Sequence, residues 1–162
     1  MKIRNHLWTL YIVGAVIIII AIMTPTSYND TGSPLYYVWM TQIGIDVDPF
    51  DIYVLRTDLT LVLVSWTLLL VIFSSALVAM TLTITYARTS LNFKKLRWKM
   101  IIIAGIAIFS TLFWIIMMEL FYNSAGFNHW SYLGGGYSPH FGVIGPFIGA
   151  ALIIIGAFTR RE

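Results

Sequence analysis

Acidic side chains at alternate positions are the first candidate for chemistry. Asp46, Asp48 and Asp51 lie close together, and carboxylate oxygens at such spacing can bind a calcium ion. A calcium loop also needs a glycine at its sharp turn and a bidentate acid near its end. Here Pro49 and Phe50 interrupt the series, and no Glu or Asn follows at the right distance. The pattern therefore favours a solvated turn over a cation site.

Histidines are the second candidate, as metal ligands. His129 and His140 could meet in space, but their spacing does not demand a metal as a helical His-x-x-x-His pair does. The chain has no cysteine, which excludes disulfides and thiolate-bound zinc, copper or iron–sulfur clusters. No nucleophile and base occur in a recognisable motif. The sequence thus predicts no metal, no cofactor and no catalytic residue, and we expect a protein that is not an enzyme.

Glu119 is the third candidate, because it stands at the end of a long apolar run. With Arg56 it could line an ion path, but no second ionisable group lies deep in any apolar run to form a proton relay. Counted from Met100 at about 1.5 Å per residue, Glu119 lies about 30 Å along a helix, which is the thickness of the hydrocarbon. We therefore expect Glu119, Arg56 and Asn123 at the outer rim of a membrane.

The composition identifies the solvent around these residues. The 162-residue chain is 59% hydrophobic and 10% charged, and its mean hydropathy is +0.83. Soluble domains are about 45 to 50% apolar and about 25% charged. The sequence therefore predicts an integral membrane protein of one domain, and its net charge of +3 does not imply nucleic acid as a partner.

Four apolar runs are long enough to cross a bilayer as helices. They cover residues 7–23, 59–85, 100–120 and 141–158. We expect an all-α membrane protein, a four-helix transmembrane bundle over residues 1–162, with outer loops at 24–58 and 121–140 and an inner loop at 87–99. A cleaved signal peptide is the alternative for the first run, although Met23-Thr24-Pro25 is a poor cleavage site.

Basic residues predict the orientation of the bundle. All but Arg56 fall on one side of the four runs: Lys2, Arg4, Arg88, Lys94, Lys95, Arg97, Lys99, Arg160 and Arg161. Cytoplasmic loops carry the excess of Lys and Arg. Both termini and the middle loop should therefore be cytoplasmic, in a multi-pass protein of the cell membrane.

The outer loops are rich in aromatic residues. In the first loop PLYYVWMTQIGI (34–45) and residues 52–55 have strand-forming composition, and they predict two short strands joined by the acidic turn, as a small extracellular sheet. Asn29 begins a possible glycosylation triplet on the same side. Exposed aromatic residues suit protein contacts. We expect such a surface to include Tyr36, Tyr37, Trp39, Phe50, Tyr53, Trp130 and Tyr132.

Glycines mark one face of the fourth run. Gly142, Gly145, Gly149 and Gly156 fall within about 60° of one another on a helix. In lipid, small residues let helices approach closely, so the face predicts a packing seam. Its partner could lie in this chain, which we favour, or in a neighbouring copy. Small residues of the second and third runs could supply the matching surface: Ser74, Ser75, Ala79, Ala104, Ala107 and Ser110.

The chain resembles the claudin and peripheral-myelin-protein group of four-span proteins. The end of the third run and the three residues after it, MELFYN (118–123), are similar to the end of the claudin third span, and the fourth run has claudin-like glycine spacing. Thr24-Pro25 and Arg56 flank the first outer loop as in that group, although the loop cysteines of the family are missing. The residues that carry the resemblance are Lys99, Gly105, Trp114, Glu119, Phe121, Tyr122, Asn123, Gly142, Gly149 and Gly156.

This resemblance implies a structural role. We expect lateral self-association of copies, or cell-surface adhesion through the extracellular loops, with membrane lipid and other membrane proteins as the partners and no small-molecule substrate. Two alternatives remain open at this point. One is a small accessory subunit of a larger membrane complex, and the other is an ion channel or transporter that uses Glu119 and Arg56.

Overall fold

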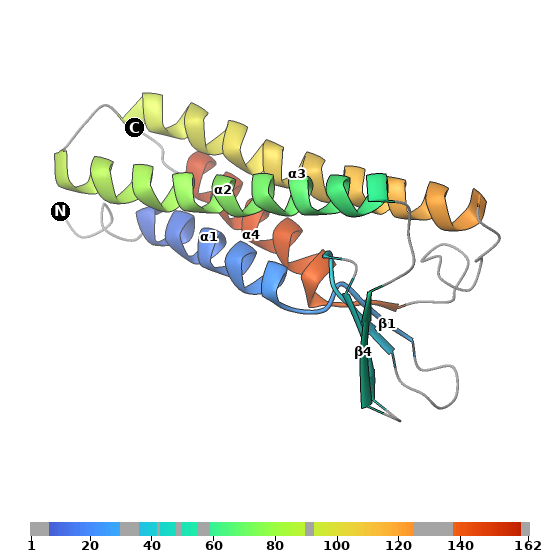
Figure 1. Ribbon diagram of the computed structural model, residues 1–162. Helices are drawn as coiled ribbons and strands as arrows, with labels where there is room; N and C mark the ends of the chain where they lie inside the picture. The colour runs from blue at the N-terminus through green and yellow to red at the C-terminus, as the bar shows by residue number, and fades with distance from the viewer. Residues whose placement is uncertain are drawn as a thin grey trace.

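Four antiparallel helices form the body of the protein (Figure 1). The computed structural model describes residues 7–29, 36–41, 43–47, 50–54, 59–89, 93–124 and 138–159. The helices are α1 (Leu7–Met23), α2 (Leu59–Thr89), α3 (Phe93–Ser124) and α4 (Phe141–Phe158). The prediction of four helices is confirmed, and α1 and α4 have the predicted bounds. A helix bonds its own backbone groups internally, which is what an apolar solvent requires of these runs.

Helices α2 and α3 extend beyond the predicted apolar runs. The predicted inner loop, residues 87–99, is largely helical, because α2 continues to Thr89 and α3 already begins at Phe93. Lys, Arg and Leu, which are frequent in this segment, are good helix formers. At about 1.5 Å per residue each helix is about 47 Å long, so each exceeds the roughly 30 Å of hydrocarbon.

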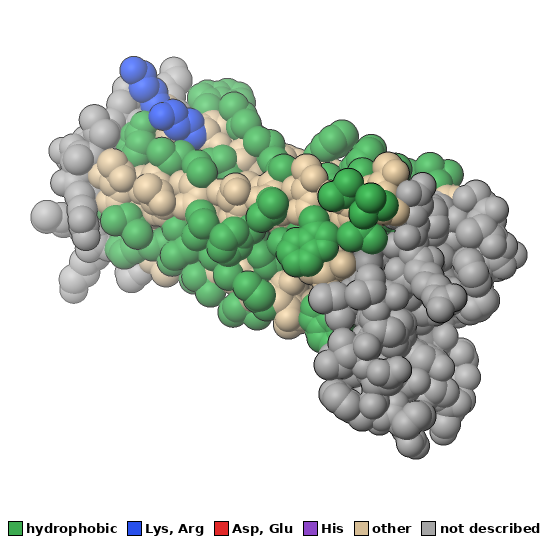
Figure 2. Space-filling view, viewed as in Figure 1, with side chains coloured by type: hydrophobic (Ala, Val, Ile, Leu, Met, Phe, Trp, Pro, Cys, Tyr) green, Lys and Arg blue, Asp and Glu red, His purple; other side chains and the backbone are tan. Residues whose placement is uncertain are grey.

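Three of the helices are long and apolar enough to cross a membrane. They are α2, α3 and α4, while α1 is equally apolar but has 17 residues. Large apolar side chains also cover the outside of the bundle (Figure 2), where Phe109 and Leu120 are exposed. A helix that is hydrophobic on all sides is typical of a membrane span. The outer surface therefore suits lipid rather than water.

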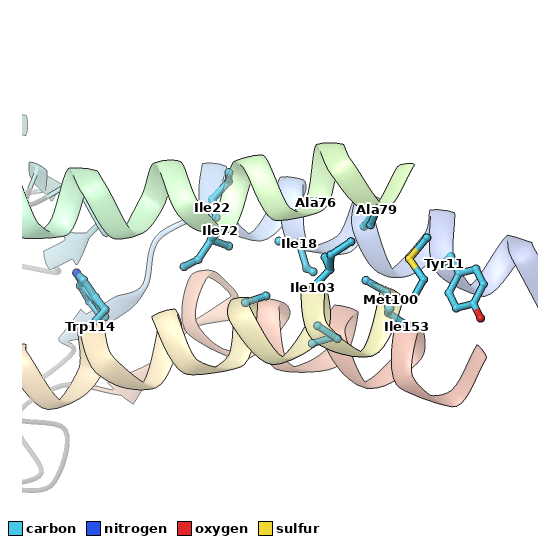
Figure 3. Close-up of a cluster of buried hydrophobic side chains, with 14 of the residues drawn as sticks. Tyr11, Ile18, Ile22, Ile72, Ala76, Ala79, Met100, Ile103, Trp114 and Ile153 are labelled. Carbon is cyan, nitrogen blue, oxygen red and sulfur yellow. The ribbon is translucent and has the colours of Figure 1, made fainter. Parts of the chain in front are cut away.

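The helices pack as a ring in which each one contacts two neighbours. Helix α1 packs on α2 and α4, α3 packs on the same two helices, and the α1–α4 contact is the most extensive. Apolar side chains from all four helices fill the interior (Figure 3). Trp114 lies toward one end of this core and Tyr11 toward the other.

A five-stranded antiparallel sheet adjoins one end of the bundle (Figure 1). Its strands are β1 (Ser27–Asn29), β2 (Tyr36–Val38), β3 (Ile43–Val47), β4 (Phe50–Val54) and β5 (Ser138–Pro139). The spatial order is β4-β3-β2-β1-β5. The sheet therefore joins the segment after α1 to the segment before α4.

The strands differ in number from the two predicted in the first loop. The stretch 34–45 contains β2 and the start of β3, with a turn at Met40 and Thr41 between them. Met40 is 1% exposed, so this turn packs its side chain into the protein. Strand β4 begins at Phe50, which pairs with Val47. Residues 48 and 49, in the middle of the predicted acidic turn, lie outside the described residues.

Candidate functional site at the sheet end of the bundle

The α1–α4 seam is built on glycine. A β-carbon on Gly149 would overlap the carbonyl oxygen of Gly14, and one on Gly14 would overlap that of Gly149. Gly145 meets Ala21 in the same way, since its β-carbon would lie 2.5 Å from that of Ala21. Gly156 continues the seam against Tyr11, at 3.0 Å. The backbones of α1 and α4 are thus in direct contact.

The partner surface of this seam is α1. None of the small residues of α2 and α3 named as possible partners is among the nearest atoms to the four glycines of α4. The residues that sequence reasoning missed are Gly14 and Ala21. A signal for them was present, because Gly14 is the one glycine of the first run and Ala21 follows it by seven residues, two turns further on the same face.

Helix α4 begins against the chain that leaves α1. The backbone N–H of Gly142 donates to the carbonyl of Pro25 at 2.8 Å, and the N–H of His140 donates to Thr26 at 2.8 Å. A β-carbon at position 142 would lie 2.5 Å from the Pro25 and Thr24 carbonyl oxygens, so glycine is required for this approach. One of the N–H groups that a helix leaves unpaired at its start is satisfied in this way.

His140 adds a side-chain contact at the same point. Its Nδ1 lies 3.2 Å from the Pro25 carbonyl oxygen, which fits the tautomer with the proton on Nδ1. The ring therefore faces a backbone acceptor. His6 and His129, the other histidines of the chain, lie outside the described residues. Among the side chains that the structure describes, no group of three His, Cys, Asp or Glu residues could hold a metal.

Trp39 fastens the sheet to the end of α1. Its indole N–H donates to the Met23 carbonyl at 3.2 Å, and the Thr24 hydroxyl donates to the Ala21 carbonyl at 2.8 Å. These bonds satisfy carbonyl groups that the last turn of a helix leaves without an intrahelical partner. Trp39, which was predicted to belong to an outer contact surface, is half-buried and holds β2 against α1.

The other predicted contact residues fall in two groups. The backbone places Tyr36 and Tyr37 in β2, and Phe50 and Tyr53 in β4. The remaining two, Trp130 and Tyr132, lie outside the described residues.

Strand register brings two of the acidic residues together. Asp46 of β3 pairs with Asp51 of β4, whereas Asp48 is outside the described residues. Like charges directly opposite each other destabilise a strand pair.

Glu119 is buried in the last turns of α3. Its side chain is 7% exposed, and it lies one residue before Leu120, where the predicted apolar run ends. Helix α3 does not end at Leu120 but continues to Ser124, so Glu119 lies within the helix. Asn123 is also helical, and Arg56 lies outside the described residues.

Several polar side chains in the bundle interior form hydrogen bonds, one of them between two helices. The Trp114 indole donates to the Ser65 hydroxyl at 3.2 Å and so links α3 to α2. Three buried hydroxyls donate to carbonyls of their own helix: Ser75 to Ile72, Thr83 to Ala79 and Thr111 to Ala107. Each of these three hydroxyls is therefore bonded within its own helix.

The comparisons with known proteins give no family. No family model matches the chain, and no curated protein has a significantly similar sequence. The likeness to the claudin group therefore depends on the residues quoted for it, of which Trp114, Gly142 and Gly149 have the packing roles described above.

Proposed function

We propose that the protein is a structural membrane protein with four spans, both termini cytoplasmic and the sheet outside the cell membrane. Three helices are long and apolar enough to cross, and α1 lies against α4, so the two share the same depth. Seventeen residues are the lower limit for a span. Arg97 and Lys99 lie near the start of α3, at the end of the bundle away from the sheet, which agrees with the positive-inside rule.

The proposed structural role depends mainly on one observation, the edge strand of the sheet. Strand β4 pairs with β3 on one side and is the last strand in the order β4-β3-β2-β1-β5. An edge strand presents backbone N–H and C=O groups to which another chain can add a strand. The bonds of Trp39 and His140 join the sheet to the end of α1, and β4 is connected to this junction through β3 and β2. This arrangement suits a contact between two proteins.

We propose that the contact is claudin-like association with further copies of the chain. It would occur between neighbours in one membrane or between two membranes, through β4 and the aromatic residues around it. The resemblance of the third and fourth helices to claudin spans supports self-association. Helix α1 already packs on the seam glycines of α4. We therefore expect the contact surface for a second copy on the sheet rather than along α4.

The β4 edge also suits a strand from a different protein, as in an accessory subunit of a larger membrane complex. Mass spectrometry of the complex extracted in mild detergent separates the two cases. Self-association predicts masses that are multiples of one chain. Monomers in native lipid would contradict it, and a fixed ratio with a second protein would favour the accessory role.

A further inference from the structure

An open groove runs between α2 and α3 on the outside of the bundle. Its volume is about 410 Å³, and its lining includes Leu70, Val71, Val78, Ile103 and Ile106. Two hydroxyls in the lining are already bonded, Thr67 to the Leu63 carbonyl at 2.7 Å and Ser75 to the Ile72 carbonyl at 2.7 Å. The groove therefore offers an apolar surface.

Cations lie where this groove approaches the start of α3. Lys95, Lys99 and Ile103 follow one another at intervals of four residues, so both lysines share a face of α3 with the groove. The Lys99 ammonium lies 5.8 Å from the centre of the Tyr86 ring. Tyr86 belongs to α2, so Lys99 bridges the two helices that form the groove.

No acid offsets these charges on the same two helices. Helix α2 contains no Asp or Glu, and Glu119 of α3 lies twenty residues beyond Lys99. The Lys95 and Lys99 side chains are both exposed. An apolar groove with two exposed cations about one and two helical turns beyond Ile103 is complementary to a molecule with a hydrocarbon chain and an anionic head.

The groove also has the length that such a molecule requires. From Thr67 to Val78 it extends about 16 Å along α2, which is about half of the hydrocarbon thickness and so the depth of one leaflet. Ile103 lies one helical turn from Lys99. An acyl chain in the groove would thus place its headgroup beside the lysines.

We infer that the α2–α3 groove binds one anionic phospholipid, with its phosphate at Lys95 and Lys99 and an acyl chain along Val78, Ile103 and Ile106. Basic pockets between membrane helices bind such headgroups. The inference rests on the membrane embedding in the proposed function, and it is independent of the proposed contact through β4.

Arg97 provides a matched control on the same helix. Its guanidinium lies 4.6 Å from the centre of the Phe158 ring of α4, on the side of α3 away from the groove. The substitutions Arg97→Gln and Lys99→Gln each remove one positive charge, at positions two residues apart. If positive charge attracts anionic lipid only in a general way, both substitutions should lower lipid retention equally. If the lipid binds at the groove, only Lys99→Gln should lower it.

The test uses the full chain in nanodiscs that contain equal amounts of phosphatidylglycerol and phosphatidylcholine. The protein is then released into mild detergent, and the lipids that stay bound to it are identified by native mass spectrometry. We expect one retained phosphatidylglycerol in preference to phosphatidylcholine. Lys99→Gln should weaken this preference about fivefold, and Lys95→Gln by a similar factor, while Arg97→Gln leaves it unchanged. Ser74→Leu, which fills the groove, should lower retention of the lipid, and excess soluble glycerol phosphate should not displace it.

Equal retention of the two lipids by the natural chain would overturn the inference. So would equal effects of Arg97→Gln and Lys99→Gln, unchanged retention in Ser74→Leu, or displacement by glycerol phosphate. Each variant is compared by thermal unfolding in detergent, so that a loss of folding is detected. Release of the chain from membranes by alkaline carbonate would overturn the proposed membrane embedding as well, whereas an embedded chain without lipid preference overturns the lipid site alone.

Discussion

Gly14 of α1 and Gly149 of α4 touch through their backbones, each occupying the space that a β-carbon on the other would need. Helices in lipid gain no hydrophobic energy from association, so close van der Waals contact must hold them together. The Gly14–Gly149 contact is accordingly the point at which the bundle should be most sensitive to a single added methyl group.

Gly149→Ala should lower the free energy of unfolding by about 1 to 3 kcal/mol, the usual cost of overpacking. The new β-carbon would also come within 2.6 Å of Ile18 Cγ1, so α1 would have to shift. The measurement is thermal or denaturant unfolding of the purified chain in one detergent. An unchanged midpoint would contradict the direct contact of α1 and α4.

Gly105→Ala is the matched control for that substitution. Gly105 is helical and exposed, and a β-carbon there would meet no atom within 4 Å. Alanine in a helix interior is favoured over glycine by about 0.5 to 1 kcal/mol. We expect Gly105→Ala to leave stability unchanged or to raise it, and a loss as large as that of Gly149→Ala would show that the method does not report helix packing.

The bond between Trp114 and Ser65 should appear as a coupling energy. Trp114→Phe removes the indole donor and Ser65→Ala removes the acceptor. Hydrogen bonds between membrane helices average about 0.6 kcal/mol and reach about 1.7 kcal/mol in double-mutant cycles. We expect the two single variants and the double variant to give a coupling in this range by unfolding in detergent. Strictly additive losses would show that the bond contributes nothing.

Gly142→Ala should loosen the junction between the sheet and α4. The added β-carbon has no room beside the Pro25 and Thr24 carbonyls, so the bond from Gly142 N–H to Pro25 should break. Amide hydrogen exchange over residues 138–143 is expected to accelerate. Ile144→Ala, at an exposed position in the same turn, is the control and should keep the slow exchange.

Glu119→Gln tests the ion-path alternative. Glu119 is buried, it is the one acidic residue in the four helices, and the interior hydroxyls of Ser75, Thr83 and Thr111 bond to their own helices. We therefore expect liposomes that carry the chain to show no ion flux above empty liposomes, with or without the substitution. A flux that disappears in Glu119→Gln would instead establish a channel or transporter.

The helices could be predicted from the sequence because an apolar run of span length has one favourable backbone structure in lipid. The bounds of α1 and α4 followed from this rule. The sheet was harder, because β1 and β5 have three and two residues and depend on tertiary bonds such as that from His140 N–H to Thr26. Their short sequences alone do not specify strands.

The candidate site was only partly predictable for a similar reason. Glycine spacing identified the α4 face of the seam, but the choice of α1 as its partner depends on which helices become neighbours. The burial of Glu119 depends on which elements pack against its face of α3. Both properties arise from packing between segments that are distant in the sequence.

The proposed function is tested most directly by the clustering of vesicles that carry the pure chain, followed by light scattering. We predict that the natural chain clusters vesicles and that Phe50→Ser with Tyr53→Ser in β4 abolishes the effect. Trp98→Ser, which removes an exposed aromatic residue of α3 at the opposite end of the bundle, should leave clustering intact. Vesicles that stay dispersed while the chain remains monomeric in lipid would contradict a role in association through the sheet.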